Sequence, residues 1–208
     1  SSSLNFLNFY KKKIDKIIFS SVVPTVFKNI KLSIKKKFKL NAKELKQHNI
    51  KKVLKIDVNM KQVGSDRLAN AISVINNKDN FIILDFGTAT TFDVILKDRY
   101  KGGIIAPGVN LSLKTLVEKA QLIPDTKLTK IKNIIGKNTQ NAVRSGFYWG
   151  YQGLIENIIN LIKKSNNMKF KIIFTGGLSH LYKNSIKDKI YVDKDLTIKG
   201  LLKLVDLT

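Results

Sequence analysis

The stretch Phe81-Ile82-Ile83-Leu84-Asp85-Phe86-Gly87-Thr88-Ala89-Thr90-Thr91-Phe92-Asp93 determines how the rest of the chain can be interpreted. Its apolar first part predicts a buried strand that ends at Asp85, and Gly87 then permits a tight turn. The threonines that follow would line a second strand with hydroxyl groups. Such a turn is suited to hold a phosphate or a cation, although an ordinary β-hairpin with a polar turn explains these residues equally well.

The composition predicts a globular protein without disulfides. Of the 208 residues, 43% are apolar and 9% are aromatic, which is typical of folded chains. The absence of cysteine excludes thiolate metal sites and favours a reducing, cytoplasmic location. The longest uncharged apolar run, residues 17–27, contains Pro24 and is shorter than the roughly 20 residues of a membrane helix. We therefore expect a soluble protein with no membrane partner.

The formal charge of +23 suggests a polyanionic partner, but the kinds of basic residue argue against specific nucleic-acid binding. The only arginines are Arg67, Arg99 and Arg144, whereas base-edge readout favours the rigid fork of arginine. Aromatic residues are not interleaved with the lysines as in single-strand binders. We interpret the lysines as a solvated surface, and a polyanion-binding protein stays open as an alternative.

Gly64-Ser65-Asp66-Arg67 precedes a helical pattern formed by Leu68, Ile72 and Ile75. Ser65 or Asp66 is expected to be the N-cap, and a capped helix is a sufficient explanation for a single aspartate. The functional interpretation is more specific. A carboxylate and a guanidinium beside each other at a helix start can accept a proton and clamp a carboxylate substrate.

Two later segments predict further strands that end in glycines. Residues 100–108 are expected to form a strand and a turn before a helix over residues 110–121. Residues 171–174 predict a buried strand that runs into Thr175-Gly176-Gly177 and then a helix. That second arrangement is a favourable seat for a nucleotide, or else an ordinary strand-to-helix turn.

The longest helical pattern, residues 140–164, carries a stripe of small residues. Ala142, Gly146, Gly150 and Gly153 share one side of this helix, although each interior glycine costs about 1 kcal/mol relative to alanine. We expect a helix of this chain or of a second protomer to pack closely against the stripe.

Seven blocks in this order resemble the type III pantothenate kinases of bacteria, which belong to the superfamily of actin and the sugar kinases. The blocks are Ser20-Ser21-Val22-Val23-Pro24, Gly64-Ser65-Asp66-Arg67, Asp85 to Asp93, Gly102 to Gly108, Gly136-Lys137-Asn138-Thr139, Phe174-Thr175-Gly176-Gly177 and Asp193 to Leu201. Together they extend over nearly the whole chain.

The resemblance implies a duplicated α/β fold of the ribonuclease-H-like, actin-like kinase type. Residues 1–80 are expected to form an N-terminally truncated first lobe with the substrate loop, and residues 81–208 the second lobe. The implied activity is ATP-dependent phosphorylation of pantothenate to phosphopantothenate, the first step of coenzyme A biosynthesis. ATP, Mg²⁺ and a monovalent cation, K⁺ or NH₄⁺, are the implied cofactors, and a homodimer is the implied assembly.

The same resemblance implies roles for individual residues. Asp66 matches the general base, and Gly64, Ser65 and Arg67 match the loop that contacts pantothenate. Thr139, in a later block, matches a further substrate contact. Asp85 matches a ligand of the monovalent cation. For ATP, the matching residues are Thr88, the adjacent Gly87, and the glycine pair Gly176 and Gly177.

Two departures from the family pattern qualify these expectations. The Asp-x-Gly-Asn-Thr turn with which the family opens has no counterpart here and is expected upstream of Ser1. Asp57 stands where the family usually has a tyrosine that contacts pantothenate. A non-catalytic, nucleotide-binding relative of the same fold is therefore the first alternative to an active kinase.

Overall fold

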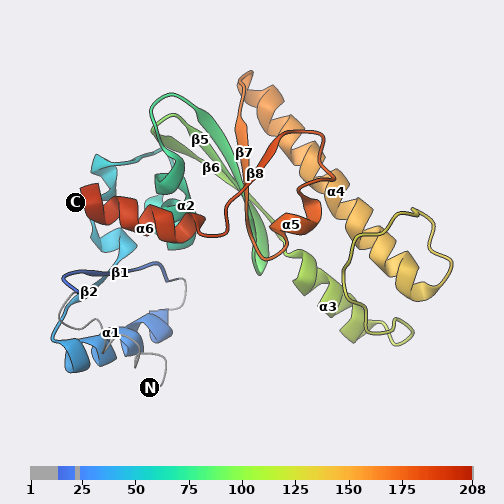
Figure 1. Ribbon diagram of the computed structural model, residues 1–208, viewed down its shortest axis with the longest axis horizontal. Coiled ribbons are helices and arrows are strands. Elements are labelled where there is room, and N and C mark those ends of the chain that lie inside the picture. Colours follow the sequence, from blue (N-terminus) through green and yellow to red (C-terminus); the bar gives the residue numbers. More distant parts are fainter. Residues whose placement is uncertain (1–13, 22–23, 208) are drawn as a thin grey trace. The chain divides into compact units, whose positions relative to one another are not determined.

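A computed structural model describes residues 14–21 and 24–207 of the chain (Figure 1). The chain forms two compact units. The first comprises Ser1–Lys55, Asn59–Val74 and Leu196–Thr208, and the second comprises Ile56–Val58 and Ile75–Asp195. The expected boundary between two lobes at residue 80 stays a prediction. The C-terminal segment from Leu196, which that boundary would assign to the second lobe, belongs to the first compact unit.

The second unit is built on a mixed β-sheet with the strand order β3-β6-β5-β4-β7-β8. Strands β4, β5 and β6 are successively antiparallel, whereas β7 runs parallel to β4 and β8 runs parallel to β7. The strands are β3 (Lys55–Ile56), β4 (Asn80–Phe86), β5 (Ala89–Leu96), β6 (Arg99–Pro107), β7 (Lys171–Gly176) and β8 (Ile190–Val192).

This strand order identifies the fold class. If β4 is counted as the first strand of the unit, the sheet reads third, second, first, fourth, fifth, with only the second strand antiparallel to the others. This topology is the ribonuclease-H-like one, so the predicted α/β fold class is confirmed. The short strand β3 extends the sheet at the β6 edge.

One face of this sheet carries the main hydrophobic core. Ile82, Leu84 and Phe86 alternate along β4, so they point to the same face, and they are buried together with Ile155 and Ile159 of helix α4 (Thr139–Asn166). Burial of each such side chain stabilises the fold by about 1.5–3 kcal/mol. The apolar run that predicts β4 is therefore explained by its position in the centre of the sheet.

An aromatic stack supports the end of β4 from the same core. The ring of Tyr182, in the short helix α5 (Ser179–Tyr182), stacks on Phe86 and on Tyr148, with 5.7 Å between ring centroids in both pairs. Burial raises the pKa of Tyr182, and Tyr151 and Tyr148 act in the same direction. The stack fixes Phe86, the residue that follows Asp85.

The first unit contains a smaller parallel sheet. Strands β1 (Ile17–Phe19) and β2 (Ala42–Glu44) pair in parallel and are connected through helix α1 (Pro24–Phe38). Ala42 is buried with Ile34 and Phe38 of α1. Of the predicted block Ser20-Ser21-Val22-Val23-Pro24, Val22 and Val23 lie outside the described residues.

Helices α2 (Ser65–Val74) and α6 (Leu196–Leu207) also belong to the first unit and pack closely. A Cβ atom at Gly200 would lie 1.8 Å from the carbonyl oxygen of Ala69, so only glycine permits this approach. Thr197 Oγ1 donates a hydrogen bond to Asn70 Oδ1 at 2.7 Å. Three short 3-10 helices, at Leu45–Gln47, Ile50–Lys52 and Met60–Gln62, connect β2 to β3 and α2.

The predicted long helices are confirmed with small shifts of their ends. Helix α3 (Val109–Lys119) begins one residue before the predicted start, and α4 extends the predicted range by one residue at its start and two at its end. Within the described residues, no helix is long and apolar enough to span a membrane.

Candidate active site

Asp85 stands near the end of β4, between two threonines of the neighbouring strands. In register it lies opposite Thr91 of β5 and beside Thr175 of β7. Asp85 is half-buried, whereas Thr175 is buried. Since side chains alternate along a strand, Asp85 points away from the core face that Leu84 and Phe86 occupy. The predicted strand thus delivers its carboxylate to a polar edge.

The turn after β4 exposes Gly87 and Thr88. The backbone N–H of Gly87 donates to the Ala89 carbonyl at 3.1 Å, which closes the hairpin between β4 and β5. Gly108, at the start of α3, packs against this turn so closely that a Cβ atom there would lie 2.0 Å from the Thr88 carbonyl oxygen. Gly108 therefore packs against the backbone of the turn, and Thr88 remains exposed.

Gly176 and Gly177 end the parallel strand β7 directly beside this turn. Gly176 has φ +83°, and a Cβ atom there would lie 2.6 Å from Asp85 Oδ1 and 2.7 Å from the carbonyl oxygen of Phe86. The N–H of Gly177 donates to that Phe86 carbonyl at 3.2 Å. The structure thus brings together five residues predicted for the site: Asp85, Gly87, Thr88, Gly176 and Gly177.

Two oxygen atoms of the turn lie close to Gly176. The Asp85 carboxylate and the Phe86 carbonyl, together with the Phe86 nitrogen, leave no room for a Cβ atom at position 176. Hard cations prefer such oxygen ligands. Among the described residues there is no group of three or more histidine, aspartate or glutamate side chains that would form an all-protein metal site.

Leu178, the residue immediately after the glycine pair, lines a pocket of 620 Å³. Its apolar lining includes Leu113 and Val117 of α3, and Asn110 and Asp125 contribute polar groups. Its further lining residues are Lys114, Glu118, Thr126, Lys127 and Leu128. A mixed apolar and polar pocket of this size is typical of small-molecule sites.

Thr139 lies at the exposed first position of α4. The Asn138 side chain caps this helix by accepting a hydrogen bond from the Asn141 N–H at 2.9 Å. The first turn of α4 is thereby fixed, and the Thr139 hydroxyl is presented beside backbone N–H groups that favour an anionic or polar ligand.

The predicted substrate loop belongs to the first unit. Asp66 is half-buried, and its Oδ1 accepts a hydrogen bond from the Arg67 N–H at 2.8 Å. Arg67 is half-buried as well, whereas Ser65 is only 3% exposed. The predicted N-cap at Ser65 or Asp66 is wrong, because α2 already begins at Ser65 and its first hydrogen bond runs from Leu68 N–H to the Gly64 carbonyl. Asp66 still benefits from the helix dipole in this first turn.

The Asp57 carboxylate forms ion pairs with two basic side chains of the second unit. Its carboxylate accepts hydrogen bonds from Arg99 Nη1 and Lys101 Nζ, both at 2.5 Å. Hydrogen bonds from Lys101 and Arg99 hold the pKa of Asp57 below its ordinary value. Its backbone N–H also donates to the Tyr100 carbonyl at 3.0 Å. This aspartate therefore joins the chain that follows β3 to strand β6.

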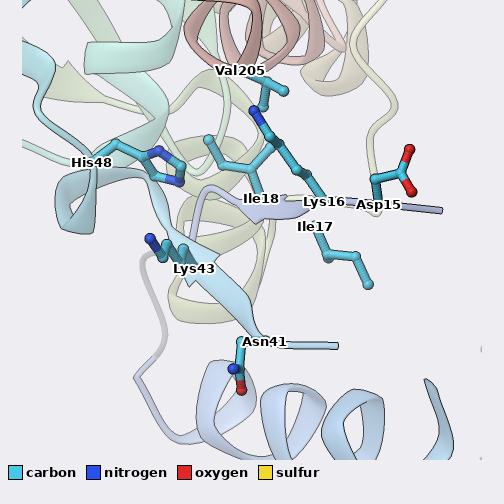
Figure 2. Close-up of a pocket in the computed structure, with 8 residues that line it drawn as sticks. All are labelled: Asp15, Lys16, Ile17, Ile18, Asn41, Lys43, His48 and Val205. Carbon is cyan, nitrogen blue, oxygen red and sulfur yellow. The ribbon is translucent and has the colours of Figure 1, made fainter. Parts of the chain in front are cut away.

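A second pocket, of 190 Å³, lies in the first unit beside the β1–β2 sheet (Figure 2). Lys16, Lys43 and His48 line it together with Asp15 and Val205 of α6. Burial lowers the pKa of His48, and Lys43 and Lys16 add to this effect, while Glu44 opposes it. None of the residues predicted for the site lines this pocket.

The sequence analysis placed Thr91 on the second strand and Thr175 after the later strand, but it did not predict that the two threonines flank Asp85. A tight hairpin in which Gly87 lies opposite Ala89 pairs Phe86 with Thr90 and Asp85 with Thr91. The turn alone could therefore have placed Thr91 opposite Asp85. Thr175 gave no such local signal, because its position beside Asp85 depends on the parallel pairing of strands that are distant in the chain.

Comparison with known proteins agrees with this architecture. A profile of the type III pantothenate kinase family matches residues 2–161. The type III pantothenate kinase of Pelagibacter ubique (strain HTCC1062) is 60% identical over 207 residues, which cover 100% of this chain and 84% of that protein. The type III pantothenate kinase of Ruegeria sp. (strain TM1040) is 38% identical over 208 residues, which cover 98% of this chain and 79% of that protein.

Among solved structures, a conserved Campylobacter jejuni protein assigned to the Baf family of transcriptional activators matches with a TM-score of 0.65 and 22% identity, over 98% of this chain and 88% of that chain. This likeness supports the fold alone. The sheet topology defines a protein of the ribonuclease-H-like class. The profile match and the relatives identify it further: the chain belongs to the type III pantothenate kinase family.

Proposed function

We propose that this chain transfers the γ-phosphoryl group of ATP to the terminal hydroxyl of pantothenate, the first step of coenzyme A biosynthesis. The observation that carries this proposal is the 60% identity to a type III pantothenate kinase along the whole chain. A cytoplasmic location fits this reaction and the cysteine-free composition. No observation among the described residues favours the non-catalytic alternative or a polyanion-binding protein.

The edge formed by β4 and β7 is the proposed ATP phosphate site. The exposed turn at Gly87 and Thr88 offers a hydroxyl and backbone N–H groups, and the glycines at 176 and 177 let a phosphate approach the backbone. Asp85 would hold the monovalent cation. When bound, this cation would neutralise negative charge on the phosphates.

The 620 Å³ pocket that Leu178 lines is the proposed site of the nucleoside. It lies next in sequence to the glycine pair, and it combines apolar walls from α3 with the polar groups of Asn110 and Asp125. Because the described residues lack an all-protein metal cluster, Mg²⁺ would be held mainly by the phosphates of ATP and water, as Mg²⁺ commonly is in kinases.

In the proposed mechanism Asp66 accepts the proton of the pantothenate hydroxyl, while Arg67 pairs with the pantothenate carboxylate. A guanidinium binds a carboxylate through two parallel hydrogen bonds, which orients the substrate. Gly64, Ser65 and Thr139 complete the proposed substrate contacts. Phosphoryl transfer has a loose transition state, so positioning supplies most of the catalysis and the base acts late.

Replacement of the base tests the proposal directly. Asp66→Asn removes the proton acceptor but keeps the size of the side chain, so turnover is expected to fall about 10²- to 10⁴-fold, while pantothenate binding measured by calorimetry is retained. Asp195→Asn makes the same chemical change at an exposed position and should leave turnover unchanged. Equal turnover of wild type and Asp66→Asn would remove Asp66 from this role.

We also propose that the protein is a homodimer that assembles through α4. The side of this helix at Gly146 and Gly150 lines an apolar groove of 360 Å³ with Phe147, Tyr151 and Leu154. No described atom lies within 4 Å of a Cβ placed on Gly146, Gly150 or Gly153, beyond the neighbouring residues and backbone of the helix itself. Because no helix of the described chain covers the stripe, a second copy is the proposed occupant.

A further inference from the structure

A row of three polar side chains crosses the sheet at the proposed phosphate edge. Thr91 and Asp85 are directly opposite each other in the antiparallel pair, and Thr175 is the partner of Asp85 on the parallel side. Opposed residues point to the same face, with Cβ atoms about 4.5–5.5 Å apart. The Thr91 and Asp85 side chains therefore lie side by side on this face.

The Thr91 hydroxyl is buried without a hydrogen-bond partner among the described residues. Its Oγ1 atom is inaccessible to solvent and has no hydrogen-bond partner within the described part of the chain. Burial of an unpaired hydroxyl costs free energy, so such a group needs an explanation, and a role beside a bound ion is one.

The adjacent Thr90 provides an internal comparison. Its Oγ1 is also buried without a hydrogen-bond partner among the described residues, and Thr90 as a whole has no exposed area. Thr90, however, lies opposite Phe86 and therefore faces the hydrophobic core. The two threonines share their chemistry and their strand, but only Thr91 shares a face with Asp85.

We propose that Thr91 is a positioning residue for Asp85. With a cation held by Asp85, the Thr91 hydroxyl donates a hydrogen bond to the carboxylate and fixes the orientation in which its oxygen faces the ion. Carboxylates that bind metal ions are commonly oriented by such partners, whose loss weakens binding about 10- to 100-fold. This inference rests on the cation site of the proposed function.

The test compares wild type with Thr91→Val, Thr91→Ser and Thr90→Val. Potassium chloride replaces tetramethylammonium chloride at constant ionic strength. The first readout is the K⁺ concentration that half-saturates pantothenate-dependent ADP release. The second is the K⁺ concentration that half-saturates the rise in melting temperature of the protein without substrates, which reports binding independently of turnover.

Thr91→Val is expected to need about tenfold more K⁺ or more in both readouts, with little change in the turnover at saturating K⁺. Thr91→Ser keeps the hydroxyl and should match wild type, as should Thr90→Val. Equal K⁺ dependence of Thr91→Val and Thr90→Val would overturn the inference, and so would a wild type that responds to K⁺ in neither readout. A wild type that is stabilised by K⁺ but has no turnover would refute the proposed function alone, and the melting experiment would still decide the role of Thr91.

Discussion

At the scale of single residues, Gly176 sets how closely β7 can approach the Asp85 turn. Its positive φ is a conformation that L-residues rarely adopt, and the surrounding atoms of Asp85 and Phe86 leave no room for a side chain. The next residue, Gly177, differs in both respects: its φ is not positive, and no described atom lies within 4 Å of a Cβ placed there. The pair thus combines one glycine required by the fold with one that leaves open space.

Gly176→Ala is expected to destabilise the protein by roughly 2 kcal/mol or more, since it adds backbone strain and a steric clash. Gly177→Ala should change the free energy of unfolding far less. Urea unfolding of both variants, followed by circular dichroism, measures the difference. Equal stability of the two variants would show that the contacts around Gly176 are wrong.

The sequence predicted Asp85, Gly87, Gly176 and Gly177 at strand ends because an apolar run followed by glycine is a local signal. It did not predict that these residues meet, since the β4–β7 pairing joins positions about ninety residues apart. The N-cap of α2 was misplaced because Ser65 and Asp66 suit either the cap or the first turn equally well.

At the scale of elements, the Asp57 cluster connects β3 to β6. The short strand β3 lies at the edge of the large sheet. The partners of Asp57, Arg99 and Lys101, come from the neighbouring strand. No local pattern could have predicted this pairing, because it depends on the sheet order.

Asp57→Asn is expected to lower the melting temperature at pH 7. The folded-state pKa of Asp57 is lowered, so its contribution is complete above the unfolded-state value of about 3.9 and is lost as pH falls through the lower folded-state value. The melting difference between wild type and Asp57→Asn should therefore shrink under acidic conditions. Glu118→Gln disrupts an exposed ion pair of 3.6 Å and should have little effect at either pH. A difference that grows on acidification would contradict this account.

At the scale of the whole molecule, the α4 groove predicts the assembly state. Leucine at position 150 would project from the middle of the groove and prevent a second helix from approaching. Gly150→Leu is therefore expected to convert a dimer into a monomer in size-exclusion chromatography with light scattering. Asn184→Leu adds the same side chain to an exposed position outside α4 and outside the groove, and should remain dimeric. A monomeric wild type would refute the proposed homodimer.

The most direct test of the central claim is the chemical identity of the product. ³¹P NMR of wild type incubated with ATP, pantothenate, Mg²⁺ and K⁺ should show ADP together with a new phosphate monoester signal, and the ester should require pantothenate. Conversion of ATP to ADP and inorganic phosphate without an ester, or no consumption of ATP at all, would contradict the assignment of this chain as a pantothenate kinase.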